Sequence, residues 1–155
     1  MKAPLLAIVC ASAIATVAAA TTTLNFSGTW VFNASKSKNI GMMSSAQITS
    51  TIRQTPKKLV VMDDTIMGGQ RQSDETDYDL VGKQVANKSP MGESSQTTSK
   101  WSGSKLITTW TTEGAIAGTK VVRIETRYLS RDGRTMFLES RRENNPPMVI
   151  VFDRK

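Results

Sequence analysis

The chain has 155 residues, of which 39% are hydrophobic and only 6% aromatic, a size and composition that suit one domain with a modest core. Lysine and arginine number 20 against 13 aspartate and glutamate, so the formal net charge is +7. The sequence contains no histidine. That absence excludes Ser-His-Asp and Cys-His catalysis, histidine-ligated zinc and a histidine pH switch, but it leaves carboxylate, lysine and tyrosine chemistry open.

The first twenty residues have the pattern of a cleaved signal peptide. Lys2 precedes an apolar run from Leu5 to Val17, and Ala18-Ala19-Ala20 supplies a cleavage site of small residues. The run is shorter than the roughly 20 apolar residues of a spanning helix, and it contains Cys10, the single cysteine. We therefore expect a signal peptide over residues 1–20, a domain over residues 21–155 without a transmembrane segment, and a secreted or periplasmic location.

Beyond residue 20 the sequence consists of short, alternating, β-branched runs separated by turn residues, a pattern typical of antiparallel strands. Asp132-Gly133 is the clearest hairpin turn. The connection 34–45 is long enough for a helix, but its polar residues and glycine predict at most one or two turns. The predicted strands are Gly28–Asn33, Ala46–Gln54, Lys58–Thr65, Gln72–Leu80, Lys83–Asn87, Ser94–Trp101, Lys105–Thr112, Thr119–Leu129, Arg134–Arg142 and Met148–Asp153.

Short connections between these strands predict an all-β, antiparallel, up-and-down meander. An open meander would expose two strand edges, whereas pairing of the first strand with the last would close it. Both of these strands are suitably apolar, with Trp30 and Phe32 alternating in the first and Ile150 and Phe152 in the last. We therefore expect a β-barrel of about 8–10 strands.

The start of this domain carries a short motif. Gly28-Thr29-Trp30 forms a Gly-x-Trp on the first predicted strand, which resembles the opening motif of lipocalins and of the wider calycin group that includes fatty-acid-binding proteins and avidins. The whole of residues 21–155 also resembles bacterial exported lipocalin-like proteins, with a lysine- and serine-rich loop after the motif. The resemblance implies that Gly28 and Trp30 close the base of a barrel and that an arginine, for which Arg154 is the candidate, packs on the tryptophan.

The alternation of side chains predicts which residues face the interior. In the seventh strand Leu106, Thr108 and Trp110 share one face, opposite Ile107, Thr109 and Thr111. In the eighth strand we expect Val122, Ile124, Thr126 and Tyr128 to point inward. Arg123, Glu125 and Arg127 would then point outward. The middle strands are rich in Ser, Thr and Gln, which predicts a partly polar interior rather than a dry one. The candidate ligand-binding residues are Tyr78, Trp101, Trp110 and Tyr128, whose rigid rings offer apolar area and, for each, one polar atom.

The acidic residues Asp74, Glu75, Asp77 and Asp79 favour a solvated outer face over a calcium site, because Leu80 occupies the position at which an EF-hand loop needs glycine. We predict no metal and no cofactor. The basic residues are scattered, which allows weak contact with anionic surfaces but gives no nucleic-acid motif.

Three functions remain open. The first is a non-enzymatic, exported, lipocalin-like barrel that binds a small hydrophobic or amphipathic molecule. The second is an envelope interaction or structural module whose barrel is filled. The third, less favoured, is a small hydrolase that uses carboxylates.

Overall fold

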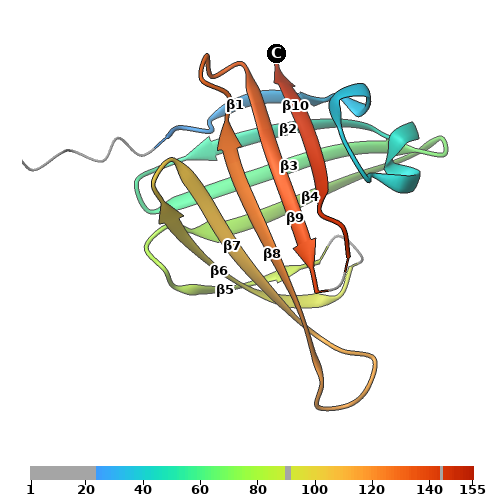
Figure 1. Ribbon diagram of the computed structural model, residues 1–155, viewed down its shortest axis with the longest axis vertical. Coiled ribbons are helices and arrows are strands. Elements are labelled where there is room, and N and C mark those ends of the chain that lie inside the picture. Colours follow the sequence, from blue (N-terminus) through green and yellow to red (C-terminus); the bar gives the residue numbers. More distant parts are fainter. Residues whose placement is uncertain (1–23, 90–91, 144) are drawn as a thin grey trace, which may run out of the picture.

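The computed structural model describes residues 24–89, 92–143 and 145–155, so the predicted signal peptide lies outside the described residues. Within them the chain forms ten antiparallel strands and two short 3-10 helices (Figure 1). The strands are β1 (Gly28–Phe32), β2 (Gln47–Gln54), β3 (Lys58–Met67), β4 (Gln70–Asp79), β5 (Gln84–Lys88), β6 (Ser94–Ser102), β7 (Lys105–Glu113), β8 (Lys120–Leu129), β9 (Thr135–Arg142) and β10 (Met148–Arg154). Each corresponds to one predicted strand, with boundaries that differ by at most two residues.

The sheet closes as the sequence predicts, through its first and last strands. β1 pairs with β10, Trp30 lying opposite Arg154 and Phe32 opposite Phe152. The strand order is β4-β3-β2-β1-β10-β9-β8-β7-β6-β5, which is an up-and-down meander whose ladder ends at β4 and β5. The expected full closure is therefore wrong in one respect: β4 and β5 are not paired through their backbones, and the barrel is nearly closed.

A side chain bridges the seam between β4 and β5. The Asn87 amide nitrogen donates to the Asp77 carbonyl at 2.7 Å, and its amide oxygen accepts from the Asp77 backbone N–H at 3.1 Å. The same nitrogen donates to the Thr97 hydroxyl at 2.8 Å. Asn87 thus satisfies a backbone donor and acceptor that a strand partner would otherwise pair.

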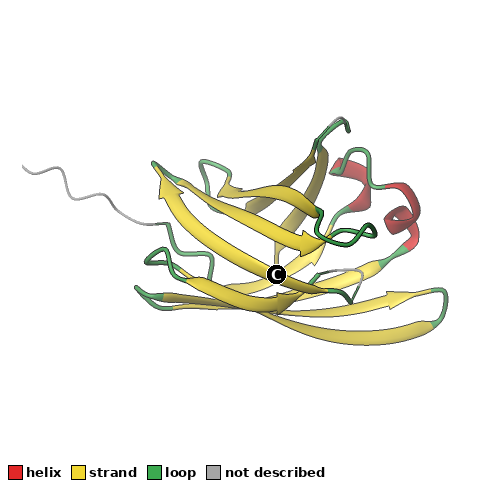
Figure 2. Cartoon of the chain, turned by 90° about the horizontal axis from the view of Figure 1, so that it is seen from below, coloured by secondary structure: helices red, strands yellow, loops and turns green. Residues whose placement is uncertain are grey.

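The connection from β1 to β2 lies at one end of the barrel, called here the helical end (Figures 1 and 2). It contains η1 (Ala34–Lys36) and η2 (Gly41–Ser45), which confirms the expectation of one or two turns. Asn33 caps η1 by accepting from the backbone N–H of Lys36 at 3.2 Å. The Lys36 ammonium binds Asp153 of β10 at 2.9 Å, while Ile40 and Met43 pack against the core. No helix within the described ranges has both the length and the apolar character needed to cross a membrane.

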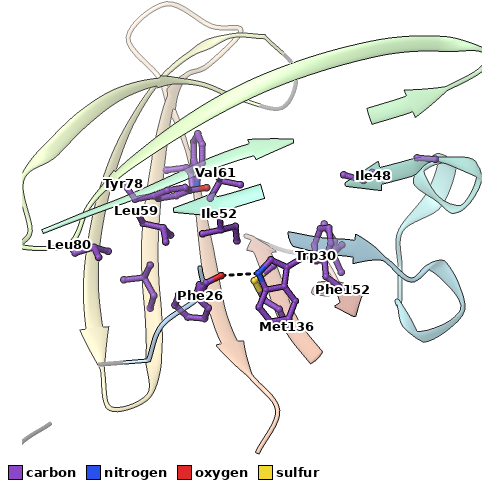
Figure 3. Packing of buried hydrophobic residues seen from close by; sticks show 14 residues of the cluster. Phe26, Trp30, Ile48, Ile52, Leu59, Val61, Tyr78, Leu80, Met136 and Phe152 are labelled. Atoms are coloured by element: carbon purple, nitrogen blue, oxygen red, sulfur yellow. Dashed lines mark hydrogen bonds between the residues drawn. The ribbon is translucent and has the colours of Figure 1, made fainter. Parts of the chain in front are cut away.

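The opposite end, called the closed end, is sealed by Trp30. Its indole N–H donates to the carbonyl of Phe26 at 2.8 Å, and both residues are fully buried beside Met136 (Figure 3). The guanidinium of Arg154 lies 4.2 Å from the centroid of the Trp30 ring and donates to the Ser27 carbonyl at 3.0 Å. This confirms the expected packing of Arg154 on Trp30 and shows a cation–π contact with additional hydrogen bonds.

Gly28 is required by this arrangement for two reasons. Its φ is +133°, which side-chain-bearing residues rarely adopt. A Cβ at this position would also lie 2.8 Å from Nη1 of Arg154. The glycine of the Gly-x-Trp motif therefore gives the arginine access to the face of the tryptophan.

We expect Gly28→Ala to lower the free energy of unfolding by about 1–3 kcal/mol because it combines backbone strain with a steric clash. Gly41→Ala is the matched control, because Gly41 also has a positive φ, of 54°, but no atom lies within 4 Å of the position that a Cβ would occupy there. Urea unfolding of both variants measures the difference. Equal losses in the two variants would contradict a specific role for the contact with Arg154.

Candidate functional site

The barrel interior has an apolar wall and a polar wall. Inward-facing residues of the first three strands and of β9 and β10 form the apolar wall. Its buried members include Trp30, Ile48, Ile52, Leu59, Val61, Met136, Ile150 and Phe152. Alternation in these strands brings every second side chain inward, as in β2 where Ile48, Ser50 and Ile52 are buried. Burial of these side chains is the main source of the barrel's stability.

The polar wall is built by β6 and β7. Ser95, Thr97 and Ser99 of β6 are all buried, and so is Thr108 of β7. The hydroxyls pair across the strands, with Ser99 and Thr108 at 2.8 Å and Ser95 and Thr112 at 2.6 Å. Each hydroxyl offers both a donor and two acceptor positions, so this wall keeps hydrogen-bonding capacity within the barrel.

Glu125 and Arg127 of β8 extend the polar wall with buried charge. Their side chains are only 7% and 5% exposed, and Nη2 of Arg127 lies 3.4 Å from Oε1 of Glu125. The same oxygen lies 3.4 Å from the Tyr78 hydroxyl. The Arg127 guanidinium lies over the Tyr78 ring, 5.2 Å from its centroid. Burial raises the pKa of Tyr78, so the phenol stays protonated and can donate to Glu125.

Asp63 of β3 faces the same cluster. Burial raises the pKa of its carboxyl, and a hydrogen bond from Ser50 and the charge of Arg127 offset this effect only in part. Oδ1 of Asp63 and Nη1 of Arg127 are buried and have no hydrogen-bond partner within the described residues. Buried polar atoms are normally satisfied, so these two atoms keep unused hydrogen-bonding capacity inside the barrel.

Trp110 joins the cluster to the helical end of the barrel. Its ring meets the Tyr78 ring edge-on, with centroids 6.1 Å apart and planes at 83°. The Arg123 guanidinium lies over its other side at 4.5 Å from the centroid. The indole nitrogen of Trp110 is buried without a hydrogen-bond partner in the described chain, and the residue as a whole is 3% exposed.

A pocket of about 280 Å³ opens at the helical end. The inward faces of β7, β8 and β9 contribute Thr112, Val121, Arg123 and Arg142 to its lining. The other lining residues are Ser89, Glu93, Glu113, Gly114 and Ala115. The volume is close to the lower limit of about 300 Å³ for small-molecule sites. The pocket therefore suits a polar group or a short segment of a larger molecule.

The four predicted ligand-binding residues do not lie together. Tyr78 and Trp110 are in contact within the interior. Trp101 is partly buried at the closed end, where it stacks on Phe26 with centroids 5.9 Å apart. Tyr128 lies on the other face of β8 from Glu125 and Arg127, where it stacks on Phe137 at 5.0 Å and has the Lys105 ammonium 4.8 Å from its ring centroid.

The predicted inward face of the eighth strand is wrong. Val122 and Ile124 are 47% and 45% exposed, whereas Arg123, Glu125 and Arg127 point inward. The prediction assumed that the apolar side of a strand faces the core. In this barrel β8 lies beside the polar strands β6 and β7. Its charged side therefore faces the interior, where Glu125 contacts Arg127 and Tyr78. In β7, for which alternation alone did not select a face, Leu106, Thr108 and Trp110 are the buried side chains.

The acidic residues of β4 have structural partners. Asp77 forms an ion pair with Lys58 at 3.0 Å. Asp79 accepts from the backbone N–H groups of Val81 and Lys83 at 3.0 and 2.8 Å and so orders the turn into β5. Asp74 and Glu75 are exposed. The described residues contain no group of three or more potential metal ligands.

Sequence reasoning missed Arg123, Glu125 and Arg127 as interior residues, although hairpin register carries a signal for them. The Asp132-Gly133 turn places Leu129 opposite Met136, and Leu129 shares its face with Arg127. Directly opposite residues point to the same side of a sheet, so if Met136 faces the interior, Leu129 and Arg127 face it too. The sequence does not show whether Met136 or Phe137 faces inward, so this inference needs the structure.

Comparisons with known proteins identify the fold. No protein-family model matches the chain, and no curated protein matches it. Solved structures do match. The structure named as REP1-NXSQ fatty acid transporter is 16% identical with a TM-score of 0.65, covering 83% of this chain and 95% of that one. Human cRBP IV is 16% identical with a TM-score of 0.62, covering 85% and 99%.

A fatty-acid-binding protein 1 from Echinococcus granulosus is 11% identical with a TM-score of 0.63, covering 83% of this chain and 96% of that one. These similarities show that the chain has the ten-stranded barrel fold of these structures. Two of the three are named as a fatty acid transporter and a fatty-acid-binding protein, which is a narrower likeness than the expected resemblance to lipocalins. The first and third of these proteins are named for transporting or binding fatty acids, and none of the three names is that of an enzyme.

We expect Glu125→Leu to lower the free energy of unfolding by about 3–5 kcal/mol, because it leaves Arg127 buried without its anionic partner. The double variant Glu125→Leu/Arg127→Met should recover most of this loss, because it removes both desolvated charges. Chemical denaturation of both variants and of Arg127→Met gives the coupling energy. Additive losses would show that the two side chains are independent.

The raised pKa of Asp63 predicts a pH dependence. The Asp63 carboxyl binds its proton more tightly in the folded chain than in the unfolded chain. The stability that Asp63 contributes is therefore present at low pH and is lost as pH rises through the folded-state pKa. Asp63→Asn should therefore be more stable than the natural chain at pH 7, and the difference should vanish below about pH 4. Asp64→Asn, an exposed neighbour, is the control in urea unfolding at both pH values. A gain that persists at low pH would contradict the proposed cause.

Proposed function

We propose that the protein is a non-enzymatic carrier that binds a small hydrophobic or amphipathic molecule inside its barrel. The observation that supports this most directly is the polar wall together with Asp63, which faces it from β3. Buried atoms of Asp63, Trp110, Arg123 and Arg127 have no hydrogen-bond partner in the described residues. A barrel that served only as a filled structural unit would gain stability from apolar residues at these positions. The names of the structurally similar proteins agree with a carrier.

Binding would use the two walls for two parts of one ligand. An apolar body would pack on the side chains around Ile48, Ile52 and Phe152, and a polar end would meet the hydroxyls and guanidinium groups of β6–β8. Trp110 is an apolar surface within the polar region, in contact with the Tyr78 ring and the Arg123 guanidinium. Its rigid ring can bury area on a ligand at little entropic cost, and its free indole N–H can donate one hydrogen bond.

We also propose that residues 1–20 are a signal peptide and that residues 21–155 are exported as the carrier. The support is the sequence pattern of Lys2, the apolar run and Ala18-Ala19-Ala20. Mass spectrometry of the protein recovered from its host would show a chain that begins at Thr21. A chain recovered intact from Met1 would contradict cleavage.

Intrinsic tryptophan fluorescence tests the carrier proposal. Residues 21–155 titrated with palmitate, retinol and an apolar naphthalene dye should give a saturable change in emission near one-to-one stoichiometry for at least one of them. Trp110→Ala should weaken that binding by about tenfold or more, because the ligand loses the area buried on the indole. Calorimetry on the same variant measures the affinity without relying on its emission.

Trp101→Ala is the matched control, since Trp101 stacks on Phe26 at the closed end and its loss should leave the affinity within about twofold. Circular dichroism must show a β-rich spectrum for both variants. A folded natural chain that binds none of the three ligands would contradict the carrier proposal. It would favour the alternative of a filled barrel that acts as an interaction module, for which the fully buried Phe26, Trp30 and Leu59 at the closed end are the supporting observation.

A further inference from the structure

We propose that Arg123 and Arg142 form a subsite for a doubly charged oxyanion at the helical end of the barrel, where they hold the phosphate monoester headgroup of an amphiphile. This inference rests on the carrier function proposed above and names the class of ligand. The two residues lie directly opposite each other in the pairing of β8 with β9 and both line the 280 Å³ pocket.

The pair is unfavourable unless an anion accompanies it. Side chains directly opposite on neighbouring strands have Cβ atoms about 4.5–5.5 Å apart, and like charges at such positions destabilise a sheet. Both guanidinium groups are permanently charged. The fold therefore places two positive charges side by side in the pocket. A bound anion would reduce the repulsion between them.

Arg123 is largely buried and is incompletely paired. Its side chain is 11% exposed, and the nearest carboxylate oxygen, Oε2 of Glu125, lies 4.0 Å from Nη2. That carboxylate lies closer to Arg127, at 3.4 Å. Nη2 of Arg123 has no hydrogen-bond partner among the described residues, while the Trp110 ring supports the guanidinium plane from one side. A buried donor of this kind is costly when it is left unsatisfied.

Arg142 supplies the second positive charge. Its side chain is exposed, and the described residues offer its guanidinium no hydrogen bond or ion pair. Its chain neighbour Arg141 differs, since it lies on the opposite face of β9 and binds Glu139 at 2.8 Å. Arg141 is thus paired with Glu139 on the outer surface, whereas Arg142 lines the pocket.

The two acidic residues that line the pocket leave this charge uncompensated. Glu93 accepts a hydrogen bond from the Ser89 hydroxyl at 3.2 Å within the turn between β5 and β6. Glu113 lies on the outward face of β7 by alternation from inward-facing Thr112. Neither residue has an ion pair with Arg123 or Arg142 among the described contacts. Glu125 compensates Arg123 only in part, at 4.0 Å, so a ligand with two negative charges would balance the two arginines better than one with a single charge.

A phosphate monoester fits this requirement better than a monocarboxylate. It carries a charge of about −1.5 to −2 near neutral pH, with three acceptor oxygens, and planar guanidinium groups bind such oxygens in pairs. Trp110 lies directly opposite Arg123 in the pairing of β7 with β8, and Thr112 and Val121 form the neighbouring pair nearer the hairpin tip. An alkyl chain attached to the phosphate would pack on the Trp110 ring on its way into the barrel.

Calorimetry at pH 8 with dodecyl phosphate, dodecanoate and inorganic phosphate tests the subsite. Dodecyl phosphate should bind the natural chain about tenfold or more tightly than dodecanoate, which has the same alkyl chain and one charge fewer. Arg142→Gln should remove most of this preference. Arg141→Gln, the matched control on the outer face, should keep it. Because Arg142 is exposed, its replacement leaves the core unchanged.

The outcomes separate the subsite from the carrier function. If both amphiphiles bind but with equal affinity, or if the two glutamine variants behave alike, the subsite is wrong and the carrier function stands. Inorganic phosphate that binds as tightly as dodecyl phosphate, with the same loss in Arg142→Gln, would show a site for a free oxyanion and overturn the amphiphile. Absence of binding for all three probes would overturn the subsite, while the retinol and dye titrations decide the carrier function independently.

Discussion

The buried pair of Glu125 and Arg127 is the constraint around which the interior is organised. Removing two charges from water costs several kcal/mol for each ion, and a contact of 3.4 Å repays this only when the remaining donors and acceptors also find partners. The Tyr78 hydroxyl supplies part of that demand, 3.4 Å from Oε1 of Glu125 and 3.5 Å from Nη2 of Arg127. The Arg127 guanidinium over the Tyr78 ring belongs to the same arrangement, and its Nη1, which has no hydrogen-bond partner among the described residues, marks where these partners end.

The two ends of the barrel differ in the hydrogen bonding of their buried tryptophans. At the closed end Trp30 is fully buried with its indole N–H satisfied, and Arg154 covers its ring while bonding to backbone carbonyls. At the helical end Trp110 also has an arginine over its ring, but its indole N–H has no partner in the described residues. The same pair of residue types thus forms a seal in one place and an incomplete polar site in the other, and the difference lies in the number of satisfied hydrogen bonds.

The sequence predicted the strands far better than the site. Alternation and turn residues locate every strand because both are local properties of the chain, and apolar first and last strands indicate their pairing. The inward face of β8 depends on what lies across the barrel. Val122 and Ile124 look like core residues when β8 is read alone, but the neighbouring strands carry Ser99 and Thr108 inward. Tyr78 and Trp110 could be predicted as aromatic residues of the interior; their contact with Arg123, Glu125 and Arg127 could not, because it joins strands from both halves of the chain.

The seam between β4 and β5 is the place in the described sheet where the backbone ladder is interrupted. A fully hydrogen-bonded barrel resists widening, because any change in girth must break a ladder of backbone bonds. Here the unpaired edges of β4 and β5 are joined through the Asn87 side chain, whose bonds to Asp77 are few and lie outside the regular ladder. Widening at this position would break only those bonds, whereas the ladders from β1 to β4 and from β5 to β10 would persist. The junction with the fewest bonds therefore lies apart from the polar wall, whose strands β6, β7 and β8 belong to the continuous part of the sheet.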